Sequence, residues 1–372
     1  MMSANSLCKM LNIRYPIIQA GMAGSTTPEL VAAVSNAGGL GIVGAARLMP
    51  DQLLDMILKI KKLTTYPYGV NLQLAQPEKS VTDENTSAVQ RFLDTNFRQN
   101  IGLKPRSGQS IALPPSSLYE AIQIILEQEV PVLSFAMGDP AKFVKQIHSS
   151  GAKVMSMITT VEEALMVAKN GTDIIVAQGS EAGGHRSTFN LDPKGELPLI
   201  GTMALVPQVV DALKKEGKDE IPVVAAGGIA DGRGLLAALA LGASGALIGT
   251  RFLVAQESGA FKAYQERLLS SKETDTSITR VFTGRPARGI SNRFMEGYLK
   301  SDLDPLAWPY QALAAEDIYQ YSHTHNNANY FPLLAGQELR LLKGGQSAAE
   351  MVKEIISEAK ENLPELNKIE VD

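Results

Sequence analysis

The feature that most constrains this chain is a regular alternation of short apolar runs with amphipathic helical segments. Each run is four to six residues long and has glycine, proline or polar residues nearby, as expected of a strand buried in a parallel sheet. Because helical segments separate most of the runs, the strands are expected to be parallel. Eight strands are predicted, at 16–19, 40–43, 68–72, 131–136, 153–158, 174–178, 222–226 and 246–249.

Helix-start signals support this interpretation. Thr27 precedes Pro28, which is a typical pair of N-cap and first helical residue. Two capping boxes, at 160–163 and 347–350, mark further helix starts. Eight βα units predict an α/β protein with a closed (β/α)8 TIM barrel. A doubly wound open sheet would ordinarily carry G-x-G-x-x-G after the first strand, and the residues after Gln19 do not supply it.

Two segments interrupt or end the alternation. Residues 76–118 are rich in Ser, Thr, Asn, Arg and Pro, and we expect them to form an insertion or lid after the third strand. The tail is loop-rich until a final helix that starts near Ser347 and has an apolar face. We therefore expect residues 1–295 to form the barrel and residues 296–372 to form a loop-rich and helical extension packed on it.

Composition limits the classes of partner. A net charge of −4 and an isoelectric point near 5.7 argue against general affinity for nucleic acid. No apolar run is long enough to span a bilayer, and the N-terminal residues lack the apolar core of a signal peptide. Cys8 is the only cysteine, which excludes a cysteine metal cluster and fits a cytoplasmic protein. An exposed polar loop explains His323 and His325 better than a metal pair does, so no metal site is predicted.

A phosphate site is expected in two consecutive loops. The strand at 222–226 ends in Gly227 and Gly228, and a helix starts shortly afterwards. The strand at 246–249 ends in Gly249, which offers another N–H group, and the next residue, Thr250, offers a hydroxyl as well. Glycine backbones approach anions closely, and barrels commonly bind phosphate at the loops after the last two strands. Either loop alone could be a tight turn, but both together favour a phosphate.

Polar and small residues follow three other strands. Gln178 ends the strand at 174–178, and a glycine-rich loop leads from it to His185. Asn71 lies near the end of the strand at 68–72, and the small residues at 20–22 follow the first strand. Side-chain amides suit a neutral heterocycle with mixed donors and acceptors, such as an isoalloxazine ring. The alternative is that these polar side chains only satisfy loop backbone and that His185 is an ordinary loop histidine.

Taken together, these motifs resemble the nitronate monooxygenase family, formerly called 2-nitropropane dioxygenases, which are FMN-dependent TIM-barrel enzymes. The resemblance spans about residues 16–337. It is carried by PIIQAGMAG at 16–24, AGGLG at 37–41, GVN at 69–71, AQGSEAGGHR at 177–186, AAGGIADGRG at 225–234, IGTRF at 248–252, ARGISNRF at 287–294 and AGQ at 335–337.

The resemblance implies a cofactor, a reaction and residue roles. The cofactor is FMN, and the reaction oxidises alkyl nitronates of the propionate 3-nitronate class with O2 to a carbonyl compound and nitrite, through a flavin semiquinone. Detoxification is the expected purpose, the partners are the small-molecule nitronate and O2, and a homodimer is the assembly considered. His185 would be catalytic and would lie beside the flavin and the substrate. The expected cofactor contacts are Ala20, Gly21, Met22, Asn71, Gln178, Gly183, Gly227, Gly228, Leu247, Ile248, Gly249 and Thr250.

Some residue roles and two rival activities stay open. His185 could hold the nitro oxygens of a nitronate, or act as general base towards a neutral nitroalkane. Arg186 could attract the anion or form a surface salt bridge. The rivals of the same fold are an FMN-dependent enoyl-acyl carrier protein reductase and an NAD(P)H:quinone reductase. An acyl carrier partner would favour a basic docking patch, and the insertion offers only a weak one. Its basic residues, mixed with acidic ones, are Arg91, Arg98, Lys104 and Arg106.

Overall fold

Eight parallel strands close into a barrel in the computed structural model, which describes residues 5–46, 48–77, 81–192 and 196–366. The ring closes where Ile18 of the first strand pairs with Leu247 of the last. The predicted barrel is therefore confirmed, and each strand lies within one residue of its expected bounds. In chain order the strands are β1 (Ile17–Gln19), β2 (Leu40–Gly44), β3 (Tyr68–Gln73), β4 (Val132–Ala136), β5 (Lys153–Ile158), β6 (Ile174–Gln178), β8 (Val223–Ala226) and β9 (Gly245–Ile248).

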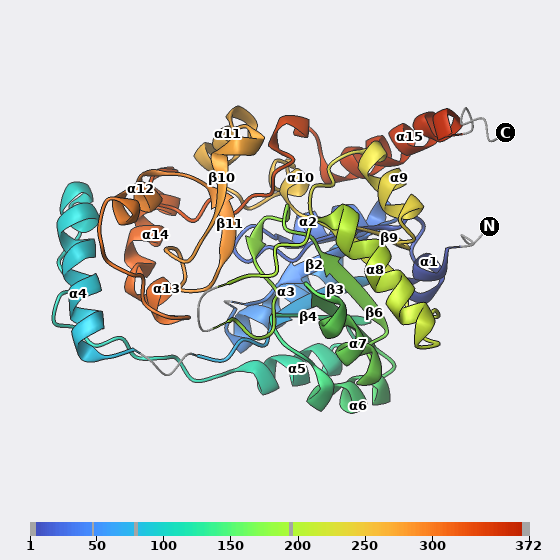
Figure 1. Ribbon diagram of the computed structural model, residues 1–372, viewed down its shortest axis with the longest axis horizontal. Helices are drawn as coiled ribbons and strands as arrows, with labels where there is room; N and C mark the ends of the chain where they lie inside the picture. The colour runs from blue at the N-terminus through green and yellow to red at the C-terminus, as the bar shows by residue number, and fades with distance from the viewer. Residues whose placement is uncertain (1–4, 47, 78–80, 193–195, 367–372) are drawn as a thin grey trace.

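Helices connect the strands and cover the barrel (Figure 1). Thr27 caps the first of these, because its side chain accepts a hydrogen bond from the N–H of Leu30. Thr160 caps another through the N–H of Glu163, but the Glu163 carboxylate accepts from Thr159 instead of closing the expected capping box. The connecting helices are α2 (Pro28–Asn36), α3 (Pro50–Leu63), α5 (Leu118–Glu127), α6 (Ala141–Ser149), α7 (Val161–Lys169), α8 (Thr202–Lys215) and α9 (Gly232–Ala240).

Side chains alternate between the interior of the barrel and the helix layer. Val176 and Leu247 belong to the interior cluster, which the N-terminal helix α1 (Ser6–Leu11) joins through Leu7. Their neighbours Ile175 and Ile248 pack among the surrounding helices instead. This period of two is the geometric rule for a strand, and it decides which residues can point into a site at the end of the barrel.

The insertion after β3 carries a helix, α4 (Asp83–Leu93), and two short turns of helix, Asp94–Arg98 and Gln99–Ile101. Figure 1 shows α4 beside the C-terminal helices α12 (Arg293–Leu299), α13 (Tyr310–Ala314) and α14 (Glu316–Thr324). Phe97 stacks on Phe294 with ring centroids 4.7 Å apart, inside a hydrophobic cluster shared by the insertion and the C-terminal segment.

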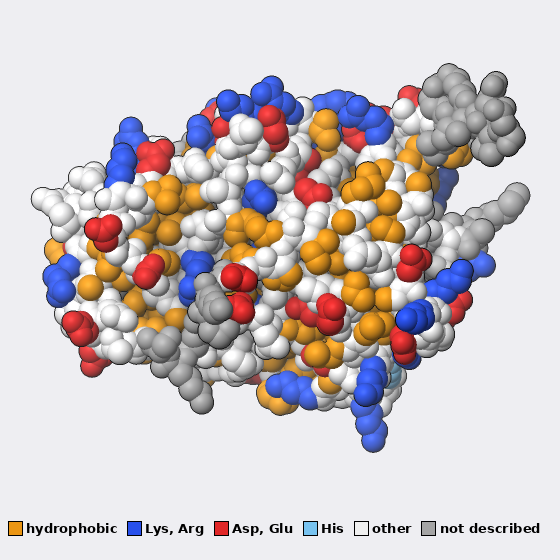
Figure 2. All heavy atoms as spheres, in the orientation of Figure 1, with side chains coloured by type: hydrophobic (Ala, Val, Ile, Leu, Met, Phe, Trp, Pro, Cys, Tyr) orange, Lys and Arg blue, Asp and Glu red, His pale blue; other side chains and the backbone are white. Residues whose placement is uncertain are grey.

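A buried arginine strengthens that contact. The guanidinium of Arg98 is fully buried and pairs with Asp317 of α14 at 2.8 Å and with Asp94 at 2.7 Å. Because Arg98 lies inside the protein, it cannot contribute to the basic docking patch considered for the insertion. Arg106 lies 3.5 Å from the same Asp317, and Figure 2 shows acidic and basic side chains interspersed over the visible face.

A small antiparallel sheet lies beside the barrel. Its order is β10 (Thr276–Thr279), β11 (Ala287–Ile290) and β7 (Gly184–His185). The two-residue strand β7 belongs to the loop after β6, and there His185 pairs with Ala287. The sheet therefore ties the expected catalytic loop to a segment about a hundred residues away in the sequence.

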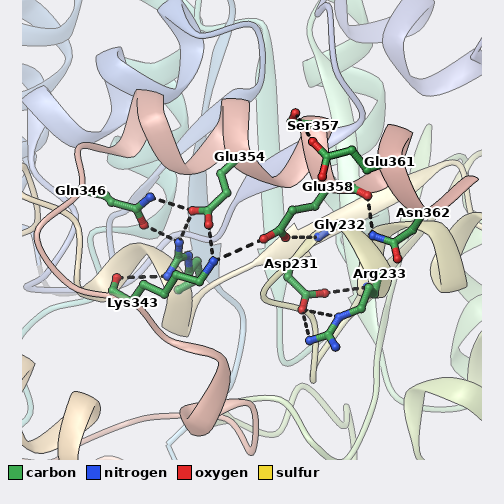
Figure 3. Close-up of polar contacts among 12 residues, drawn as sticks. Asp231, Gly232, Arg233, Lys343, Gln346, Glu354, Ser357, Glu358, Glu361 and Asn362 are labelled. Carbon is green, nitrogen blue, oxygen red and sulfur yellow. Dashed lines mark hydrogen bonds and ion pairs between the residues drawn. The ribbon is translucent and has the colours of Figure 1, made fainter.

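The last helix, α15 (Ala348–Leu366), packs on α9 and α2. Its apolar residues Met351 and Ile355 are buried, as the sequence predicts. A polar network holds it to the loop after β9, where buried Arg251 of α10 (Thr250–Leu253) donates to Glu354 at 2.8 Å. Figure 3 shows Glu354 with Lys343 and Gln346, and Glu358 accepting from the N–H of Gly232. The remaining elements are α11 (Lys262–Ser270), η3 (Glu273–Asp275) and η4 (Leu339–Leu341).

Within the described ranges, no helix combines the length and the apolar character needed to cross a bilayer.

Candidate active site

A cavity of about 250 Å³ opens at the carboxyl ends of the barrel strands. This is the end of the barrel at which enzymes of this architecture place their chemistry. Apolar side chains such as Met157, Trp308 and Phe331 line much of it, and no lysine or arginine is among its described lining residues. The predicted site residues that line it are Ala20, Gly21, Met22, Asn71, Gln178, Gly183, His185, Gly227, Leu247, Gly249 and Thr250.

Two predicted cofactor contacts lie apart from this cavity. Ile248 packs its side chain among the surrounding helices, so only its backbone can reach a ligand at the strand end. Gly228 lines a neighbouring hollow of about 390 Å³, which lies between the loop after β8 and residues 337–341. Gly227, Ile229 and Glu338 line both spaces, so the cavity and the hollow adjoin at these residues.

The imidazole of His185 lies in the cavity and contacts two residues from the C-terminal part of the chain. Its Nε2 atom lies 2.8 Å from the hydroxyl of Thr283. The Trp308 ring meets it edge-on, with centroids 5.2 Å apart and an angle of 78° between the planes. Neither partner was predicted, because nothing in the local pattern around 283 or 308 indicates proximity to 185. The only available signal was the ARGISNRF motif, which includes the strand that pairs with β7.

The side-chain amide of Gln178 holds the loop that carries His185. Its Nε2 donates to the carbonyl oxygen of His185 at 2.9 Å, and its Oε1 accepts from the N–H of Ser187 at 2.9 Å. The Gln178 amide thus forms hydrogen bonds with loop backbone, as the alternative to a cofactor contact predicted. Gln178 also lines the cavity, so it can still contact a ligand there. Asn71 also lines the cavity, and its amide donates to the hydroxyl of Ser134 at 3.0 Å.

Arg186 is buried, so the surface salt bridge, one of its two possible roles, is wrong. Its guanidinium donates to the carbonyl oxygens of Gly179 at 2.6 Å and Gln178 at 3.1 Å. Burial, with a smaller contribution from nearby Arg288, lowers the pKa of Arg186 to about 10. Because it bonds to loop backbone and does not line the cavity, it braces the site instead of attracting an anion into it.

The first of the two expected phosphate loops contains a pair of glycines with unusual backbone angles. Gly227 and Gly228 both have positive φ angles, +112° and +72°. Residues with a side chain rarely adopt these angles, and glycine allows the backbone to approach a ligand closely. Asp231 caps the helix that follows by accepting from the N–H of Gly234 at 3.0 Å. Thr250 lines the same cavity as Gly227, and its hydroxyl accepts from the N–H of Gly336 at 3.0 Å.

Glu338 is a functional candidate that the sequence did not predict. It is only 8% exposed, and it lines both the cavity and the neighbouring hollow. Burial raises the pKa of Glu338 above its usual range, against the lowering effects of its own backbone N–H and the nearby hydroxyl of Thr250. The residue follows directly after the AGQ motif, which was the signal that could have found it.

Comparisons with known proteins agree on one family. The profile of the nitronate monooxygenase family matches residues 4–358. A probable nitronate monooxygenase from Staphylococcus saprophyticus is 42% identical over 360 residues, which cover 95% of this chain and 96% of the relative. A probable nitronate monooxygenase from Staphylococcus aureus strain Newman is 40% identical over 343 residues, covering 92% and 93% of the two chains.

Solved structures extend the comparison. A nitroalkane oxidase from Streptomyces ansochromogenes matches with a TM-score of 0.86 at 32% identity, covering 97% of this chain and 99% of the other. FabK from Thermotoga maritima matches with a TM-score of 0.73 at 28% identity, covering 98% and 99% of the two chains.

Proposed function

Because this chain belongs to the nitronate monooxygenase family and is an oxidoreductase, we propose that it uses FMN and O2 to oxidise alkyl nitronates, with propionate 3-nitronate as the representative substrate, to carbonyl compounds and nitrite. The observation that carries this proposal is the position of His185. Its imidazole lines a largely uncharged cavity at the end of the barrel together with the small residues that follow β1, and it contacts the hydroxyl of Thr283.

The residues around this cavity fit FMN. A Cβ added at Gly249 would meet only Ala20 at 3.7 Å and Met22 at 3.9 Å, so the backbone there faces an open space that a side chain would begin to fill. Apolar and aromatic walls suit a flat heterocycle, and the glycine pair at 227–228 suits its phosphate. When bound, the flavin supplies the redox chemistry, accepting electrons from the substrate and passing them to O2.

His185 has the chemistry needed to bind a nitronate. A nitronate is a nitroalkane that has lost a proton, so its oxygens carry negative charge and accept hydrogen bonds. An imidazole donor in a cavity with mostly apolar walls stabilises such an anion more strongly than it would in solution. For a neutral nitroalkane, the same imidazole can take the proton from the carbon next to nitrogen.

Thr283 suits both roles of His185. Its hydroxyl lies 2.8 Å from Nε2 of the imidazole and 3.2 Å from the carbonyl oxygen of Arg285. A hydroxyl both donates and accepts, so it can accept from a protonated Nε2 while donating to that carbonyl, or donate to an unprotonated Nε2. The ring therefore keeps this hydrogen bond in either protonation state.

Aerobic turnover with defined substrates tests the proposal. The purified protein, loaded with FMN, should consume O2 and release nitrite when it is given propionate 3-nitronate or a simple alkyl nitronate. Nitrite release should depend on the nitronate and should not require NADH or NADPH. Absence of nitrite and of nitronate-dependent O2 uptake, in a protein that binds FMN, would reject this function.

A further inference from the structure

The carboxyl group of Glu338 occupies an unusual position between the two expected phosphate loops. It lines the hollow that Gly228 borders and also the cavity that Gly249 borders. The side chain is more than nine-tenths buried, and its Oε2 atom has no hydrogen-bond partner among the described residues. A buried polar atom without a partner costs free energy, so its presence indicates a partner that arrives with a ligand.

The charged groups around Glu338 do not neutralise it by direct pairing. The Glu181 carboxylate, on the loop after β6, accepts from the N–H and the hydroxyl of Thr202. Arg288, on β11, donates to the carbonyl oxygen of Ser180 and to the hydroxyl of Thr276. Arg340, on η4, lines the same hollow but pairs with Glu273 at 2.6 Å.

On the cavity side of Glu338, the nearby titratable group is the hydroxyl of Tyr264 on α11, which donates to the carbonyl oxygen of Leu334.

These surroundings favour the neutral form of the carboxyl group. Burial raises the pKa of Glu338 most strongly, and the nearby negative charge of Glu181 raises it further. These effects outweigh the residue's own backbone N–H, the Thr250 hydroxyl and Arg288, which lower it. Within the described residues no salt bridge reaches Glu338, so no paired cation holds it in the ionised state. A neutral carboxylic acid has an O–H donor, whereas a carboxylate can only accept.

We propose that Glu338 is a neutral carboxylic acid at the phosphate subsite of FMN and donates a hydrogen bond to the cofactor phosphate. This inference rests on the proposed use of FMN. Phosphate esters carry between one and two negative charges near neutral pH, so an ionised carboxylate beside them would be repelled. Ionisation of Glu338 therefore converts a donor into a repelling charge, and FMN binding weakens as the pH rises.

Cofactor binding to the apoprotein tests this directly. The protein is stripped of FMN, and the Kd for FMN and for riboflavin, which lacks the phosphate, is measured by flavin fluorescence between about pH 6 and about pH 9. The variants are Glu338→Gln, which keeps a neutral donor, and Glu162→Gln, which removes an exposed carboxylate on α7. The ratio of the Kd for FMN of the unmodified protein to that of Glu338→Gln should rise about tenfold or more over this range. The ratio for riboflavin should stay constant, and Glu162→Gln should follow the unmodified protein.

Three results overturn the inference. An FMN ratio that does not change with pH would show that ionisation of Glu338 does not affect binding of the phosphate. The proposed nitronate oxidation would still stand in that case. A riboflavin ratio that rises as steeply would place the effect away from the phosphate. Failure of the unmodified protein to bind FMN at any pH would reject both the inference and the use of FMN. If Glu338→Gln does not fold, Glu338→Ala takes its place in the same ratios: the FMN ratio should still rise with pH, and the riboflavin ratio should stay constant.

Discussion

The Nε2 atom of His185 lies 2.8 Å from the hydroxyl oxygen of Thr283, which is 98 residues away in the sequence. The pairing of β7 with β11 brings the two segments together, because His185 and Ala287 are directly opposed. The orientation of the expected catalytic imidazole therefore depends on the C-terminal part of the chain as well as on the barrel.

We predict that Thr283→Val lowers kcat about five- to tenfold, since a hydrogen bond of this kind contributes roughly 1 kcal/mol. Val has nearly the same shape as Thr but cannot hold the imidazole by a hydrogen bond. The KM and the Kd for FMN should stay nearly constant, and Thr283→Ser should restore most of kcat. Steady-state kinetics with a nitronate, together with FMN titration, measure these values. A loss of FMN affinity as large as the loss of kcat would indicate general damage to the site. It would contradict a role for Thr283 in holding the His185 imidazole.

We predict that His185→Asn lowers turnover about 100-fold or more, while FMN remains bound. Asparagine can donate a hydrogen bond, but it cannot carry a proton or a positive charge near neutral pH. The variant should retain the flavin absorption spectrum of the unmodified protein. Rates indistinguishable from those of the unmodified protein would remove His185 from the chemistry.

The barrel was largely predictable because its strands follow local rules. The run from Ile174 to Gln178 is apolar, short and followed by glycine, and its observed bounds equal the predicted ones. Thr27 and Pro28 similarly mark the start of α2 by local chemistry alone. Such signals come from residues that are close in the sequence, so they can be recognised without knowledge of the tertiary structure.

The parts of the site that were missed depend on long-range packing. β7 is two residues long and has no periodicity that could reveal it. The burial of Arg186 and of Arg98 runs against the usual exposure of arginine, and both are accommodated by partners that only the fold brings near. The boundary at 295/296 between barrel and extension stays a prediction.

We predict that Asp317→Asn destabilises the protein by about 2 kcal/mol, because it leaves the buried Arg98 guanidinium with Asp94 as its remaining acidic partner. The loss should appear as a lower urea midpoint in equilibrium unfolding. The matched control is Asp55→Asn, which breaks the exposed pair with Lys59 and should change the midpoint little. Equal midpoints for the two variants would contradict a stabilising role for the Arg98 pair.

The raised pKa of Glu338 predicts a pH-dependent stability of the apoprotein. In the unfolded chain this carboxyl group titrates near its ordinary value of 4.5, whereas the folded protein keeps the proton to higher pH. The stabilisation is therefore complete below about 4.5 and is lost as the pH rises through the folded-state value. The Tm of Glu338→Gln, relative to that of the unmodified apoprotein, should accordingly increase from about pH 5 to about pH 8. A Tm difference that is constant over this range would mean that Glu338 is ionised in the folded protein.

Anaerobic rapid mixing tests the central claim most directly, because it isolates the transfer of electrons from substrate to flavin. The protein with FMN bound is mixed with propionate 3-nitronate, and in parallel with NADH and NADPH, while the flavin absorbance is followed. We predict that the nitronate bleaches the flavin at least as fast as kcat and that neither nicotinamide does so. Rapid bleaching by NADH or NADPH, with none by the nitronate, would contradict the account and assign the protein to the reductases that share this fold.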